Sequence, residues 1–145
     1  MTTSVSLPKK IIVAVDGSEP SMKAVSYAAK LAKLAGSRLM ILNVILLPTF
    51  ASLKTLENLR KDLSTKATQI LEKSKGIAGT VSVDSESRMV ETDRSVVEAI
   101  IESSENEKAD LIVLGSRGTT MGKLMLGSIA AGTANLAHSP VLVVR

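Results

Sequence analysis

Short apolar runs alternate along this chain with segments whose apolar residues recur at helical spacing. The run 11–15 is continuous and rich in β-branched residues, which is typical of a strand buried on both faces. The apolar residues of the next segment follow a helical period and stop at Gly36, a residue type common just after helices. Continued along the chain, this alternation predicts strands at 11–15, 38–44, 80–90, 111–114 and 141–144, and helices at 21–35, 53–76, 96–101 and 128–138.

This order of elements predicts an α/β fold. Strands that alternate with helices form parallel sheets with right-handed crossovers and helices on both faces. The segment 80–90 has more polar positions than the other strands, so we expect it at an edge of the sheet. No linker or repeat interrupts the pattern, and we therefore expect a single domain over residues 1–145 with one five-stranded sheet.

Composition narrows the classes of function. The chain has no cysteine, which excludes disulfides, thiolate metal ligands and a cysteine nucleophile. No apolar run approaches the length of a membrane span, and residues 1–8 lack the order of a signal peptide. We therefore expect a cytoplasmic protein without a membrane partner.

The net charge of +4 raises the question of a nucleic-acid partner. However, cations stand beside acids, as Lys61 does beside Asp62, and such interleaving is typical of a solvated face. Tyr27 and Phe50 are the only aromatic residues, so the chain offers no platform on which bases can stack. These observations argue against nucleic-acid binding.

The richest chemistry lies in the segment 115–128, which follows the apolar run 111–114 directly. It holds four glycines, four hydroxyl side chains and two cations. Glycines let backbone N–H groups approach an anion closely, and a helix N-terminus adds unpaired donors and a favourable dipole. A strand that leads through such a loop into a helix is typical of phosphate binding in α/β proteins.

The ends of three predicted strands are expected to converge beside this loop. Open α/β sheets bind ligands at the carboxyl ends of their strands, where the strand order reverses. Asp16 and Gly17 follow the first predicted strand, and Asn43 and Val44 end the second. Together with the glycine loop after the fourth strand, they predict a binding site at that edge.

Two common phosphate motifs do not fit the loop. A Walker loop requires a glycine five residues before Gly122 and a Ser or Thr after Lys123, where the chain has Arg117 and Leu124. The dinucleotide fingerprint is absent, and the first strand ends in Asp-Gly-Ser instead.

The motifs that the chain does carry resemble those of the universal stress protein family. They are Val13-Ala14-Val15-Asp16-Gly17-Ser18, Leu111-Ile112-Val113-Leu114-Gly115-Ser116-Arg117-Gly118, Gly127-Ser128 and Pro140-Val141-Leu142-Val143-Val144. The resemblance covers 10–145. It implies a parallel sheet of adenine-nucleotide α-hydrolase-like topology with strand order 3-2-1-4-5. The ATP-binding branch has Gly-x-x-Gly, nine residues and then Gly-Ser or Gly-Thr; here eight residues separate Gly118 from Gly127.

The resemblance implies an ATP site with two ends. At the base end, Asp16 would contact the ribose, Ala14 and Val15 would line the adenine pocket, and the backbone of Val44 would face the adenine. A second group of residues would surround the ribose and phosphates: Gly115, Gly118, Gly127, Ser128 and Ile129. Arg117 would add positive charge to the phosphate tail, and we expect the hydroxyl of Ser128 to cap the fourth helix.

The residues do not predict catalysis. No histidine or other base is evident beside Ser116 or Ser128, and Asp16 alone does not make a two-metal site, although it can hold one Mg²⁺ through water. We assign no catalytic residue and no metal ligand. The preferred hypothesis is an ATP-binding regulatory stress-response protein in which the nucleotide switches a conformational or dimer equilibrium. The alternatives are a slow ATPase or adenylate-chemistry enzyme on the same fold, and a stress protein that binds no nucleotide and acts through protein interaction.

Two further expectations concern structure. Asp16 and Gly17 also have a purely structural interpretation, in which Asp16 caps the first helix and Gly17 makes the turn. The apolar strand at 141–144 would expose unpaired backbone groups at a sheet edge, and pairing with a second copy would cover them. Together with the family resemblance, this predicts a homodimer through the C-terminal strand.

Overall fold

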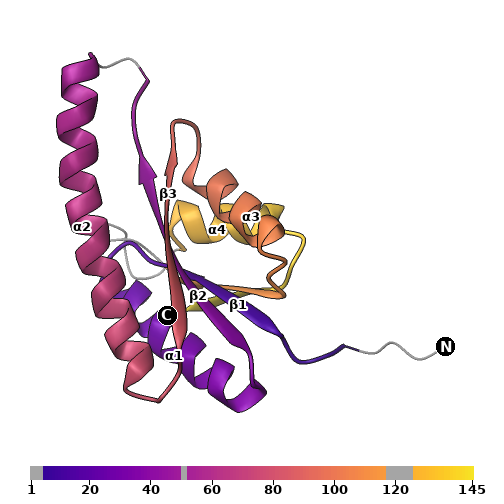
Figure 1. Cartoon of the computed structure of the whole chain (residues 1–145). Helices are drawn as coiled ribbons and strands as arrows, with labels where there is room; N and C mark the ends of the chain where they lie inside the picture. Colours follow the sequence, from indigo (N-terminus) through magenta and orange to yellow (C-terminus); the bar gives the residue numbers. More distant parts are fainter. Residues whose placement is uncertain (1–4, 50–51, 117–125) are drawn as a thin grey trace.

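The computed structural model of the chain describes residues 5–49, 52–116 and 126–145. Its elements follow the predicted order, four strand–helix units and a last strand (Figure 1). The strands are β1 (Lys10–Ala14), β2 (Arg38–Leu46), β3 (Ser85–Thr92), β4 (Leu111–Gly115) and β5 (Val141–Val144). The helices are α1 (Glu19–Ala35), α2 (Leu53–Gly79), α3 (Val96–Asn106) and α4 (Ser128–Leu136).

The strands form one parallel sheet in the order β3-β2-β1-β4-β5. This confirms the predicted fold class and strand order. From β1 the chain winds outward through β2 to β3, and it then crosses back to add β4 and β5 on the other side. The strand order therefore reverses beside β1, which is where sheets of this type bind ligands.

Two helices cover each face of the sheet (Figure 1). Ile11 and Val13 of β1 point to the face covered by α1 and α2, where the first core cluster lies. Ile12, between them, points to the opposite face, where Ile100 of α3 and Ala130 of α4 complete the second cluster. Successive strand residues face opposite sides, so a strand buried on both faces is apolar throughout. This explains the continuous run at 11–15.

The predicted third strand is wrong at its start. α2 continues to Gly79, and β3 begins only at Ser85 instead of at residue 80. Val81 and Val83 lie in the connecting turn, yet both pack against the first core cluster. Their period-two spacing therefore reflects two turn side chains that point into the core. The edge position predicted for this strand is confirmed.

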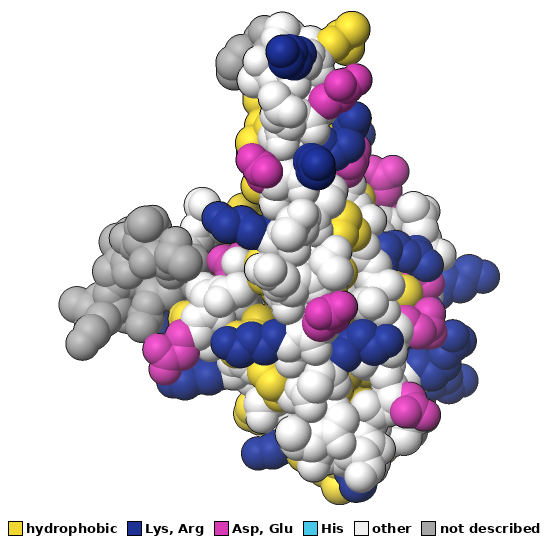
Figure 2. Space-filling model, turned by 60° about the vertical axis from the view of Figure 1, so that its left-hand side comes forward, with side chains coloured by type: hydrophobic (Ala, Val, Ile, Leu, Met, Phe, Trp, Pro, Cys, Tyr) yellow, Lys and Arg dark blue, Asp and Glu magenta, His cyan; other side chains and the backbone are white. Residues whose placement is uncertain are grey.

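The outer surface of α2 carries many charged side chains. Figure 2 shows Lys and Arg interspersed with Asp and Glu over this side of the molecule, as they are along the sequence. Among the described residues, no helix has the length and apolar composition needed to cross a membrane.

Candidate functional site

The carboxyl ends of β1, β2 and β4 meet at one edge of the sheet, as predicted. Ala14 lies in register with Leu42 of β2 on one side and with Leu114 of β4 on the other. Just beyond β1, the N–H of Val15 donates to the carbonyl of Leu42 at 2.8 Å. The turn after β1 and the glycine-rich segment after β4 therefore start side by side.

The turn after β1 is held by its own side chains. Oδ1 of Asp16 accepts a hydrogen bond from the N–H of Ser18 at 2.9 Å. Ser18 in turn caps α1, because its Oγ accepts from the N–H of Ser21 at 3.3 Å. The expectation that Asp16 caps this helix is therefore wrong. The Asp16 side chain is exposed at the edge of the sheet, with one carboxylate oxygen outside this turn hydrogen bond.

Gly17 makes the turn that was expected of it. Its φ of +86° lies in the left-handed region that glycine adopts without strain. A Cβ at this position would lie 3.0 Å from Cδ1 of Ile70, so α2 packs directly against the turn.

Asn43 is a residue of this edge to which the sequence pattern assigned no role. It is buried within β2, and its Nδ2 donates to the carbonyl of Val15 at 2.8 Å. A buried polar group requires such a partner, and here the bond ties β2 to the chain just beyond β1. The signal in the sequence was one amide inside an apolar strand. The expected end of that strand at Val44 was also wrong, because β2 continues to Leu46.

Gly115 permits a close approach between β4 and α1. A Cβ built on it would lie 2.7 Å from the backbone carbon of Pro20 and 2.8 Å from the nitrogen of Ser21. Real Cβ contacts of this length are essentially never found, and the neighbouring atoms are backbone, which cannot move aside easily. Gly115 therefore has a structural role that the family pattern did not predict.

Ser116 and Gly127 are joined by the backbone. The N–H of Gly127 donates to the carbonyl of Ser116 at 2.7 Å. Ser116 is 1% exposed, and its Oγ has no hydrogen-bond partner among the described residues. Unpaired buried hydroxyls are rare in proteins and call for an explanation.

Among the described residues, no side chain caps the N-terminus of α4. Gly127 is the N-cap residue and Ser128 is the first helical residue, so the prediction that the Ser128 hydroxyl caps this helix is wrong. The first N–H groups of a helix have no intrahelical partner, and a glycine cap has no side chain to bind them. Ser128 and Ile129 are both exposed at this end. Within the described residues these first N–H groups have no side-chain partner, and the helix starts next to Ser116, whose carbonyl accepts from Gly127.

The remaining residues predicted for the site do not all lie on one face of the sheet. Ala14 and Val44 both pack with the second core cluster, on the face of α3 and α4. The side chain of Val15 is buried in the first cluster, on the opposite face. Arg117 and Gly118 lie outside the described residues. Within the described ranges, no group of three or more metal-binding side chains occurs.

Both the sequence and the fold of this chain are similar to those of known proteins. A sequence profile of the universal stress protein family matches residues 8–145. Universal stress protein MJ0531 from Methanocaldococcus jannaschii is 33% identical over 143 residues, which cover 96% of this chain and 83% of that protein. A crystal structure of a universal stress protein in complex with cAMP is 27% identical, with a TM-score of 0.75 and coverage of 97% and 98% of the two chains. The universal stress protein from Archaeoglobus fulgidus in complex with dAMP, at 18% identity, TM-score 0.74 and coverage of 96% and 99%, shares the fold.

The close approach of Gly115 to the backbone of α1 predicts that a methyl group at this position lowers stability. Gly115→Ala forces the added methyl group against the backbone of α1, and we expect it to lower the free energy of unfolding by about 1–3 kcal/mol. Gly76→Ala is the matched control, because no atom lies within 4 Å of its added Cβ inside α2. Alanine favours a helix more than glycine does, so this control is expected to gain up to about 1 kcal/mol. Urea denaturation measures both variants, and equal stabilities would contradict the packing role of Gly115.

Proposed function

The chain belongs to the universal stress protein family, and from that premise we propose that it is a cytoplasmic ATP-binding regulatory protein of the stress response. The proposal treats residues 1–145 as a single domain. ATP binds at the carboxyl edge of the sheet, between the ends of β1 and β4. The bound nucleotide switches the conformation or the dimer state of the protein.

The observation that carries this proposal is the uncapped N-terminus of α4 beside the buried hydroxyl of Ser116. Phosphate oxygens are strong acceptors, and helix N-termini attract them through free N–H groups and the helix dipole. A phosphate group in this position would also accept a hydrogen bond from Ser116 Oγ, which has no partner among the described residues. Arg117 and Gly118 are assigned to the phosphates on the basis of the family pattern alone.

The part of this edge formed by the ends of β1 and β2 suits a nucleoside. The exposed carboxylate of Asp16 can accept hydrogen bonds from ribose hydroxyls, since only its Oδ1 is bonded within the turn. Ala14 and Val44, on a common face of the sheet, offer apolar contacts to the base. Mg²⁺ accompanies the phosphates in this proposal, and no residue is assigned as its ligand.

The kinds of nucleotide bound by relatives support this assignment. The 27% identical relative is in complex with cAMP, which is an adenine nucleotide. The choice of ATP for this chain rests on the glycine pattern around Gly115, Gly118 and Gly127, which is one residue shorter than that of the ATP-binding branch.

We also propose that the switch acts on a homodimer formed through β5. This strand lies at the free edge of the sheet, and all four of its residues are partly exposed. α1 contacts β5 and carries Tyr27 and Leu34, whose side chains are 53% and 86% exposed. A second copy paired with β5 would cover the unpaired backbone groups of the edge.

One backbone hydrogen bond links the proposed phosphate site to this edge. The N–H of Ser116 donates to the carbonyl of Val144, the last residue of β5, at 2.8 Å. A ligand that reorients Ser116 therefore acts directly on the strand that pairs with the second copy. This contact supports the coupling of nucleotide binding to dimerisation.

Nucleotide binding is testable at two residues with different physical effects. Asp16→Ala removes a charged acceptor, and we expect it to weaken Mg-ATP binding roughly ten-fold or more.

Ser116→Ala removes one neutral hydrogen bond, and we expect the affinity for Mg-ATP to fall roughly 2- to 10-fold. The same Ser116→Ala change removes a buried hydroxyl that has no partner among the described residues, so the nucleotide-free protein should become no less stable. Isothermal titration calorimetry and thermal unfolding measure the two effects.

The matched control is Asp62→Ala, an equivalent charge loss at an exposed position of α2. It should leave the affinity for Mg-ATP unchanged. The proposal fails if the unaltered protein takes up no adenine nucleotide, or if Asp16→Ala and Asp62→Ala bind it equally well.

The dimer proposal is testable with one backbone donor. The carbonyl groups of Pro140 and Val144 accept from Ile112 of β4 and from Ser116, the residue after β4. The N–H and C=O groups of successive strand residues point to opposite sides. The N–H of Val143 therefore faces the free edge. Val143→Pro removes this donor but leaves the bonds to β4, so we expect a folded monomer by circular dichroism and analytical ultracentrifugation. Val143→Ala is the control that should remain dimeric, and a dimeric proline variant would exclude pairing through β5.

A further inference from the structure

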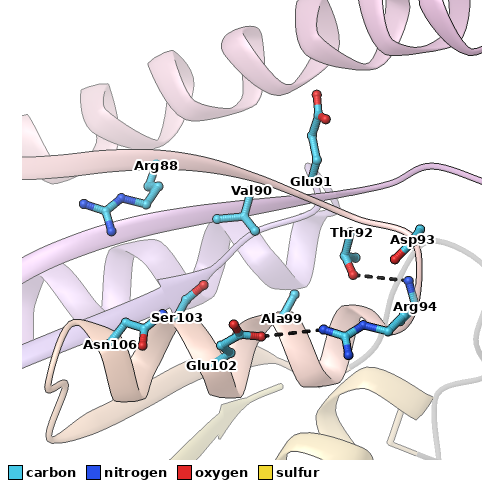
Figure 3. A pocket seen from close by; sticks show the side chains of 10 residues that line it. All are labelled: Arg88, Val90, Glu91, Thr92, Asp93, Arg94, Ala99, Glu102, Ser103 and Asn106. Atoms are coloured by element: carbon cyan, nitrogen blue, oxygen red, sulfur yellow. Dashed lines mark hydrogen bonds and ion pairs between the residues drawn. The ribbon is translucent and has the colours of Figure 1, made fainter.

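A second hollow lies on the far side of α3, between that helix and the edge strand β3 (Figure 3). Its volume is about 480 Å³, within the range of small-molecule sites. None of the ten residues predicted for the nucleotide site lines it. Its floor residue Val90 is the register partner of Val44, so the hollow adjoins the base end of the proposed nucleotide site. Neither the motifs nor the proposed nucleotide function accounts for it.

Small residues on one flank of α3 keep this space open. Ala99 and Ser103, four residues apart on the helix, line the hollow and are both mostly buried. Opposite them Val90 of β3 is half-buried, although it belongs to the apolar layer of this face. Larger side chains at these two helix positions would fill the gap above Val90. The floor of the hollow is thus apolar at its centre, and Val90 and Ala99 form it.

The end of the hollow near the carboxyl end of β3 is acidic overall. Arg94 lies in the turn after β3 and reaches toward Glu102 of α3, with Nη2 4.0 Å from Oε2 (Figure 3). Both side chains remain mostly exposed, at 71% and 64%. Asp93 also lines this end, which therefore holds two carboxylates and one guanidinium. Glu91 points to the other side of β3, where it pairs with Arg60 at 3.0 Å.

The opposite end of the hollow carries one cation, Arg88. Arg88 lines the hollow there and forms an ion pair with Glu107. Glu107 also accepts a hydrogen bond from Nζ of Lys10 at 2.7 Å. The hydrogen bond from Lys10 lowers the pKa of Glu107, which keeps this carboxylate ionised. Glu107 is thus shared between Arg88 and Lys10, so it does not belong to Arg88 alone.

The two ends are separated by about the length of a short peptide. Arg88 and Thr92 are four residues apart on β3, which corresponds to roughly 13 Å between their Cα atoms at about 3.3 Å per residue. Figure 3 shows that Arg94 folds back toward α3, whereas the Arg88 side chain points away from Val90. An extended chain of three or four residues has its terminal ammonium and carboxylate at a similar separation.

We propose that this hollow binds short peptides of three or four residues through their free termini. The terminal ammonium lies at Glu102 and Asp93, and the terminal carboxylate lies at Arg88. Small apolar side chains rest on Val90 and Ala99. The Ser103 hydroxyl, which lines the hollow, is a hydrogen-bond partner for the peptide backbone. The peptide then runs antiparallel to β3, and the charge separation of the hollow selects its direction.

The first test compares two forms of one peptide. Calorimetry with free L-Ala-L-Ala-L-Ala is expected to detect binding, and the same peptide with acetylated and amidated ends is expected to bind at least ten-fold more weakly. In methyl NMR spectra, the free peptide should shift the signals of Val90 and Ala99. Equal affinity for the two forms, or no shift at either methyl group, overturns the proposal.

The second test uses exposed glutamates of α3, whose replacement does not endanger folding. Glu102→Gln removes the charge that faces the ammonium, and we expect it to weaken binding of the free tripeptide about ten-fold. Glu105→Gln is the control, because Glu105 is on the same helix but does not line the hollow. The control should bind the tripeptide as the unaltered protein does. If the two variants bind it equally, the acidic end is not the ammonium site and the proposal is wrong.

Discussion

The position of β1 between two parallel neighbours is the constraint on which the rest of the molecule depends. Its pairing with β2 and β4 brings the ends of three strands to one edge, although Ala14 and Leu114 are far apart in sequence. Both faces of β1 are buried beneath helices, so its side chains are apolar and polar groups appear only where the strand ends. The turn at Asp16 and the segment that begins at Gly115 thus meet because of the sheet order.

Ser116 connects the parts of this edge that the proposed function requires. Its carbonyl accepts from Gly127 at the start of α4, and its N–H donates to Val144 at the end of β5. Its hydroxyl, buried and without a partner among the described residues, is the group left for a ligand. One residue therefore contacts the helix N-terminus, the candidate phosphate site and the edge strand β5. Such an arrangement gives a nucleotide a short route by which to influence assembly.

The fold could be predicted because alternating strands and helices leave a strong pattern, and the polar residues at strand ends marked the edge where the carboxyl ends of β1, β2 and β4 meet. Contacts between distant segments left weaker signals. The glycine at 115 was expected to serve a ligand, whereas its contact with Pro20 depends on how close α1 lies to β4. The caps at Ser18 and Gly127 depend on backbone angles that several nearby residues could have adopted. Val81 and Val83 imitated a strand because side chains of a turn can also point into a core.

The central claim is that an adenine nucleotide lies between the end of β4 and the start of α4. Backbone amide chemical shifts recorded during a titration with Mg-ATP test it most directly. The account predicts saturable shifts at Gly115, Ser116, Gly127 and Ser128, with smaller changes along β3. Saturable shifts that leave these four amides unmoved, or the absence of any shift at saturating nucleotide, would contradict it.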